Sequence, residues 1–100
     1  MALLELTIIP VGTGNPSVGD FIADIEKALE NENVPSTLTD MGTILEGTPE
    51  KLLEIASRLH EIPFQRGAAR VITQIRIDDR RDKEIRLGDK TAAVQARLRK

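Results

Sequence analysis

The order of β-type and helical segments constrains the fold of this chain more than any other feature. Four segments have the β-forming residues or the alternating apolar positions of strands, and two segments between them have the apolar spacing of amphipathic helices. The predicted strands are residues 3–11, 36–41, 43–47 and 70–78, and the predicted helices are residues 18–31 and 49–62. This β-α-β-β-α-β order is that of the split βαβ, or ferredoxin-like, arrangement. We therefore predict a single α+β domain over residues 1–100, with a four-stranded antiparallel sheet and two helices on one face.

Residues at the segment ends support these boundaries. Ser17 is a suitable N-cap for the first helix. Thr48 is a suitable N-cap for the second helix, and Pro49 occupies its first position. Pro63 is expected to end or kink that helix. In the last strand, alternation places Ile75 on the face with Val71 and Ile77, which we expect to be buried.

The C-terminal part is predicted to add a third helix. Residues 78–88 are highly charged and are expected to form a solvated connection. Asp89 is a candidate cap for a short helix that runs through Arg99. Val94 and Leu98 are expected to face inward from this helix.

The composition excludes several classes of protein. The chain has no cysteine, so disulfides and thiolate metal sites are excluded, and its net charge of -2 argues against a nucleic-acid surface. No apolar run approaches the ~20 residues of a membrane span, and the N-terminus has no signal-peptide pattern. We therefore predict a cytoplasmic protein that binds neither nucleic acid nor membrane.

Self-association is expected because the domain is small and one sheet face has no helix to cover it. Ile9, Ile72 and either Ile44 or Leu45 are expected to fall on that face. The sequence therefore predicts a homo-oligomer.

Glu46 is the strongest candidate for a binding residue. It is a lone carboxylate among β-forming residues, where burial costs free energy unless the group is paired or meets a ligand. Ionised carboxylates recognise aminopyrimidines and other nitrogen heterocycles by accepting N–H hydrogen bonds. Thr37, Thr39 and Met41 on the neighbouring strand are expected to complete a small pocket. The alternative is an ion pair with Arg76 or Arg70.

Other candidate sites are weaker. The loop at residues 12–14 precedes a helix, as in anion sites, but it lacks the further residues of a nucleotide-binding motif, so a plain turn is favoured. His60 is the only histidine and has no cysteine or second histidine as a metal partner. The alternating charges of residues 78–83 are typical of a solvated face, with a subunit interface as the alternative.

Three motifs together resemble one family. They are TIIPVGTG at residues 7–14, MGTILEG at residues 41–47 and GAARVITQIRIDDRRDK at residues 67–83. In this order and spacing they are similar to those of the small thiamine-binding proteins, over nearly the whole chain. The resemblance implies a ferredoxin-like fold, dimers that associate into tetramers, and binding of thiamine or its hydroxymethylpyrimidine moiety rather than catalysis.

The resemblance also implies candidate ligand residues by motif position, which are Thr13, Met41, Thr43 and Glu46. Arg76 falls in the third motif with Asp78 and Arg80, where pocket and interface roles are not separated by sequence. No metal and no cofactor is expected. The alternative function is an oligomeric assembly or regulatory module with an unrelated effector or none.

Overall fold

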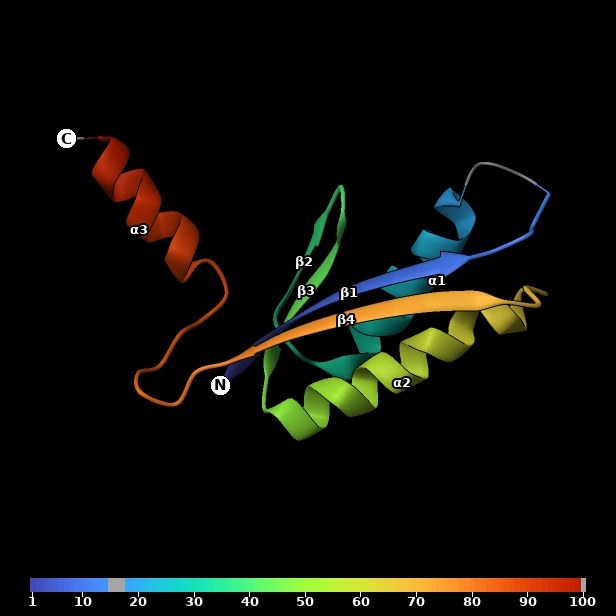
Figure 1. The fold of residues 1–100 in the computed structure, drawn as a ribbon, viewed down its shortest axis with the longest axis horizontal. Coiled ribbons are helices and arrows are strands. Elements are labelled where there is room, and N and C mark those ends of the chain that lie inside the picture. The colour runs from blue at the N-terminus through green and yellow to red at the C-terminus, as the bar shows by residue number, and fades with distance from the viewer. Residues whose placement is uncertain (15–17, 100) are drawn as a thin grey trace.

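The computed structural model describes residues 1–14 and 18–99, and its elements follow the predicted order (Figure 1). The elements are β1 (Ala2–Pro10), α1 (Gly19–Leu29), the short 3₁₀ helix η1 (Glu30–Glu32), β2 (Ser36–Thr39), β3 (Gly42–Gly47), α2 (Pro49–Gln65), β4 (Val71–Asp79) and α3 (Asp89–Leu98). The four strands form one sheet in the order β2-β3-β1-β4, with every pairing antiparallel. The predicted α+β fold, with its ferredoxin-like strand order, is confirmed.

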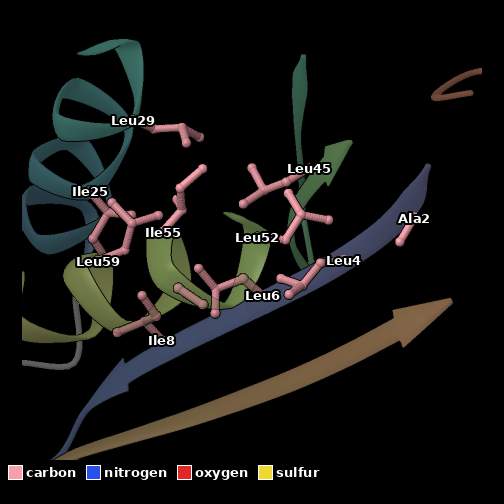
Figure 2. Packing of buried hydrophobic residues seen from close by; sticks show 11 residues of the cluster. Ala2, Leu4, Leu6, Ile8, Ile25, Leu29, Leu45, Leu52, Ile55 and Leu59 are labelled. Carbon is pink, nitrogen blue, oxygen red and sulfur yellow. The ribbon is translucent and has the colours of Figure 1, made fainter. Parts of the chain in front are cut away.

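One aliphatic core lies between the sheet and the helices α1 and α2 (Figure 2). Leu4, Leu6 and Ile8 alternate along β1 toward this core, and Leu4 lies opposite Leu45 of β3. Ala2 of β1 belongs to the same cluster, and the helices contribute its six other side chains, which are Ile25, Leu29, Leu52, Ile55, Ala56 and Leu59. Full burial of one such side chain contributes about 1.5–3 kcal/mol, so this layer holds the sheet and the helices together.

The ends of the helices agree only in part with the sequence. Thr48 caps α2 as predicted, because its hydroxyl accepts a hydrogen bond from the Lys51 backbone N–H at 3.3 Å. Pro63 does not end α2, which continues to Gln65. The Pro63 side chain is fully buried, so the helix gains packing where it lacks one backbone hydrogen bond. The predicted cap Ser17 lies outside the described residues.

Strand β4 is at an edge of the sheet, and this corrects the expectation that Ile75 is buried. Ile75 and Ile77 lie opposite Leu6 and Leu4 and so point to the helix side, but 45% and 39% of their surface is exposed. Periodicity identified the correct face of the strand. It could not show that the helices leave the end of this edge strand uncovered.

The C-terminal helix α3 also differs from the prediction. It stands apart from the sheet and the other helices (Figure 1) and buries no residue. Val94 and Leu98 are therefore exposed, by 49% and 73%, rather than directed inward. The N-cap is Gly88, at a φ of 92°, and not Asp89. The radius of gyration is 15.1 Å, against about 13 Å for a compact chain of this length, as expected with a projecting helix.

None of the helices in the described part of the chain is long and apolar enough to span a bilayer. A cytoplasmic location stays a prediction.

Candidate functional site

The predicted site residues lie on opposite faces of the sheet. Side chains alternate along β3, so Thr43 and Leu45 point toward the helices. Glu46 points to the other side, which we call the open face. Thr39 and Met41 line a cavity at the other end of β3 that does not include Glu46, so the expectation that Glu46 shares one pocket with them is wrong. Strand β2 pairs with β3 only from Ser36 to Thr39, where Thr39 lies opposite Gly42.

On the helix side, α1, β1 and the turn between β2 and β3 enclose a cavity of about 210 Å³, which we call the hairpin pocket. Its walls are mostly aliphatic and include Leu6, Ile8, Ile22, Ile25, Leu38 and Met41. Three of the predicted ligand residues line it, namely Thr39, Met41 and Thr43. A largely preformed apolar pocket with a few polar groups is the usual form of a small-molecule site.

Glu26 and Thr43 provide a polar contact inside this apolar pocket. Thr43 is only 6% exposed, and its hydroxyl donates a hydrogen bond to Glu26 Oε2 at 3.1 Å. Glu26 is half-buried and lies on α1, four residues after Ile22. Helical spacing therefore places it beside the apolar stripe of α1. Glu26 is not among the residues predicted from the sequence, although this spacing is a signal that could have identified it.

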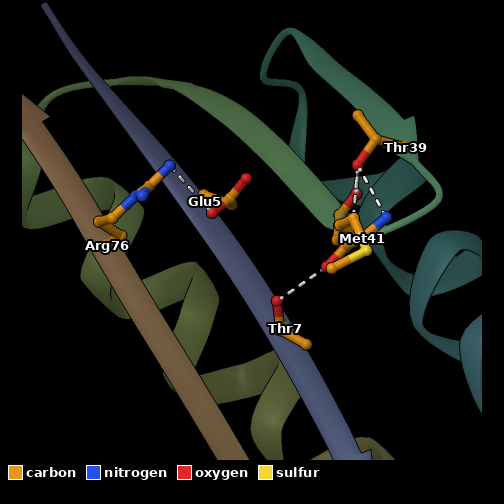
Figure 3. A network of polar contacts seen from close by, with 6 residues as sticks. Glu5, Thr7, Thr39, Met41 and Arg76 are labelled. Carbon is orange, nitrogen blue, oxygen red and sulfur yellow. Dashed lines mark hydrogen bonds and ion pairs between the residues drawn. The ribbon is translucent and has the colours of Figure 1, made fainter.

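Hydrogen bonds between threonine hydroxyls and the backbone hold the rim of the hairpin pocket (Figure 3). The Thr39 hydroxyl donates to Gly42 O at 2.9 Å and accepts from the backbone N–H groups of Met41 and Gly42 at 3.2 and 3.1 Å. Thr7 Oγ1 donates to Met41 O at 3.1 Å and ties the turn to β1. A Cβ atom at Gly42 would lie 2.8 Å from Leu6 O, so the close approach of the turn requires glycine. The Met41 side chain remains 80% exposed at the mouth.

Glu46 is buried by the C-terminal segment and not by the hairpin. It is 5% exposed, and its Oε1 accepts a hydrogen bond from the Leu87 backbone N–H at 2.8 Å. Arg86 Nη1 lies 3.9 Å from Glu46 Oε2. The arginine beside Glu46 is thus Arg86, and not the predicted Arg76 or Arg70. Arg76 instead pairs with Glu5 at 3.4 Å (Figure 3). A ligand role for Glu46 stays a prediction.

Arg76 lines a second cavity, the open-face groove, of about 300 Å³ between the sheet and residues 86–91. The groove has mixed charges, because Glu5 and Asp78 line it together with Arg76, Arg86 and Lys90. Residues 78–88 are therefore not a purely solvated connection. Leu87 is half-buried where this segment returns to the sheet.

The alternating charges next to the groove pair within the chain. Arg80 contacts Asp82 at 2.5 Å, and Arg81 contacts Asp79 at 2.8 Å. The hydrogen bond from Arg81 lowers the pKa of Asp79 below the usual aspartate value, and the hydrogen bond from Arg80 does the same for Asp82. These exposed pairs are in agreement with a solvated charged face, and a role between subunits stays a prediction.

The remaining candidates lie elsewhere. Thr13, half-buried in the loop after β1, is not among the residues that line either cavity. His60 Nδ1 lies 2.6 Å from Thr73 Oγ1, and its ring meets Phe64 edge-on with centroids 5.6 Å apart. These contacts favour a packing role for His60. The residues described by the structure contain no group of three or more His, Cys, Asp or Glu suited to a metal ion.

The chain is similar to members of one protein family over nearly its whole length. The family profile described as "Thiamine-binding protein" matches residues 4–95. The UPF0045 protein YqgV of Bacillus subtilis is 44% identical, and the alignment covers 98% of each chain. A UPF0045 protein of Methanothermobacter thermautotrophicus is 38% identical, over 98% of this chain and 100% of the relative.

Solved structures agree with the fold. A protein of Methanocaldococcus jannaschii superimposes with a TM-score of 0.83 at 28% identity, over 94% of this chain and 95% of that one. A Thermotoga maritima protein, described as a candidate thiamine biosynthesis or salvage protein, has a TM-score of 0.77 over 93% of this chain and 97% of its own. Its identity is 15%, so this second likeness concerns the fold alone.

Proposed function

This chain belongs to the thiamine-binding protein family, and from that premise we propose that it is a non-catalytic binding protein for thiamine or its hydroxymethylpyrimidine moiety. We place the ligand in the hairpin pocket. The observation that carries this proposal is a half-enclosed aliphatic pocket with one carboxylate–hydroxyl pair inside it, at Glu26 and Thr43. It contains three of the six residues predicted as ligand contacts.

The chemistry of the pocket suits a small heterocycle. Aliphatic side chains such as Ile22 and Leu38 cover the faces of a ring and remove its apolar surface from water. No aromatic side chain is among the described lining residues, so stacking on an aromatic ring is replaced by contact with Met41. The thioether of methionine is polarizable and adapts to ring edges and faces.

Calorimetric titration with thiamine and with hydroxymethylpyrimidine tests the proposal. Wild-type protein should bind at least one of them. Ile22→Trp should abolish binding, because the larger side chain fills the pocket. Leu53→Trp is the matched control, since Leu53 is a similarly exposed helical residue on α2 that does not line the pocket. If wild-type protein binds neither compound, this function is refuted.

A second candidate function is an oligomeric assembly or regulatory module. It is favoured by the apolar surface that the single chain leaves uncovered, which includes Ile75, Ile77 and Leu98. Native mass spectrometry together with the titration separates the two proposals. An oligomer that binds neither compound would support the assembly module.

A further inference from the structure

We propose that Glu26 makes the hairpin pocket selective for amino-bearing, unphosphorylated nitrogen heterocycles. This inference rests on the proposed function and specifies which forms of the ligand the same pocket accepts. It assigns the recognition of the ring amino group to Glu26 and not to Glu46.

The geometry leaves one oxygen of Glu26 available to a ligand. Thr43 Oγ1 donates its hydrogen bond to Glu26 Oε2. Within residues 1–14 and 18–99, no hydrogen bond is donated to Glu26 Oε1. The bond from the buried Thr43 also fixes the carboxylate on the wall of the cavity. A carboxylate oxygen only accepts hydrogen bonds, so the group that it favours is an N–H donor such as a ring amino group. An analogue with hydrogen in place of the amino group offers no donor to this oxygen.

The charges of the pocket disfavour phosphate. Glu26 and Asp40 both line it, and no Lys, Arg or His is among its described lining residues. Residues 15–17, outside the described part, are Asn, Pro and Ser and bring no cation either. A phosphate group in this cavity would lose hydration and meet carboxylates without a compensating charge. The free heterocycle is therefore favoured over its phosphate ester.

Glu46 does not offer a comparable acceptor. Leu87 N–H donates to one of its oxygens, and Arg86 lies near the other. It also lies on the open face, on the opposite side of β3 from Thr43. A ligand at Glu46 would have to displace the C-terminal segment first.

The test compares four compounds on wild-type protein by calorimetric titration. They are hydroxymethylpyrimidine, its monophosphate, thiamine, and the pyrimidine analogue with hydrogen in place of the ring amino group. We expect the phosphate and the analogue without the amino group to bind at least about ten-fold more weakly than hydroxymethylpyrimidine. Glu26→Gln keeps the size of the side chain and should weaken hydroxymethylpyrimidine about ten- to a hundred-fold, the range of a charge-assisted hydrogen bond.

Two further variants make the result specific. Glu61→Gln removes one exposed charge from α2 and should leave the affinity unchanged. Glu46→Gln tests the rival carboxylate and should have far less effect than Glu26→Gln. Equal binding by wild type and Glu26→Gln, or equal binding of the free and phosphorylated pyrimidine, would overturn the selectivity while the binding function stands.

A fragment experiment separates failure of the inference from failure of the function. Aminopyrimidine and unsubstituted pyrimidine are titrated at millimolar concentration, and the Thr43 and Gly42 amide resonances are followed by NMR. If thiamine and hydroxymethylpyrimidine do not bind, the proposed function fails. A shift caused only by the amino fragment, and lost in Glu26→Gln, would still support the selectivity, whereas no shift would overturn it as well.

Discussion

Replacement of Glu46 by alanine should release the C-terminal segment from the sheet. The structure attaches this segment through the buried carboxylate, which accepts the Leu87 N–H at 2.8 Å and lies near Arg86. Helix α3 buries no residue, so it adds no packing that would hold the segment after this contact is lost. We therefore expect local opening of residues 80–99, with the aliphatic core little affected.

The size of the effect follows from the kind of bond that is lost. A hydrogen bond to a charged acceptor contributes about 1.5–3 kcal/mol, which corresponds to a roughly ten- to hundred-fold increase in the opening equilibrium. Hydrogen exchange measured by NMR reports this directly, as faster exchange of the Leu87 amide. Glu46→Gln keeps an acceptor oxygen but not the charge, so its effect should be intermediate.

Glu84→Gln is the matched control for this experiment. Glu84 contacts the same arginine, Arg86, at 3.0 Å, but both side chains are about 60% exposed. Exposed ion pairs contribute little, so this variant should leave Leu87 exchange close to that of wild type. Unchanged Leu87 exchange in Glu46→Ala would refute the view that Glu46 holds the segment.

Three further predictions concern stability and assembly. Leu4→Ala removes a fully buried side chain and should lower the free energy of unfolding in urea by about 2–5 kcal/mol, whereas Ile75→Ala, at 45% exposure, should cost only about 1–2 kcal/mol in the monomer. Equal losses would show that Ile75 is covered by a partner. Arg58 holds the pKa of Glu32 below its ordinary value of 4.5 through a hydrogen bond, so the stability from this pair is present above that pH and is lost as the pH falls below it. The difference in Tm between wild type and Glu32→Gln should therefore shrink from pH 7 to pH 3, and a constant difference would contradict the assignment. Native mass spectrometry at micromolar concentration should show a dimer or tetramer, and a monomer alone would contradict the predicted self-association.

The fold could be predicted from sequence because its signals are local. Alternation along residues 3–11 and helical spacing from Ile22 to Leu29 each report one apolar face, and the order of such faces selects the ferredoxin-like arrangement. A periodic pattern does not say what covers that face. The pattern therefore predicts that Val94, Leu98 and Ile75 are buried. In the structure, the core of the single chain does not reach these three residues.

The site was harder to predict because its contacts are not local. The carboxylate of Glu46 accepts a hydrogen bond from Leu87, which is 41 residues away in the sequence. Leu87 belongs to a segment whose many charges predict a solvated connection. Glu26 is a common polar residue at the edge of an apolar stripe until the fold brings Thr43 to it from β3. Only Thr39, Met41 and Thr43, which belong to one hairpin, could be placed together from their proximity in sequence.

The two edges of the sheet are unequal, and this limits how copies of the chain can polymerise. Strand β2 has only four residues and follows Pro35, which has no N–H to offer, whereas β4 exposes a nine-residue edge. Addition of a further strand is therefore favoured at β4 alone. If two copies paired their β4 edges about a two-fold axis, both β4 edges would be covered. Only the short β2 edges would then remain exposed. Growth by strand addition would then stop at a closed pair and would not continue into a fibre.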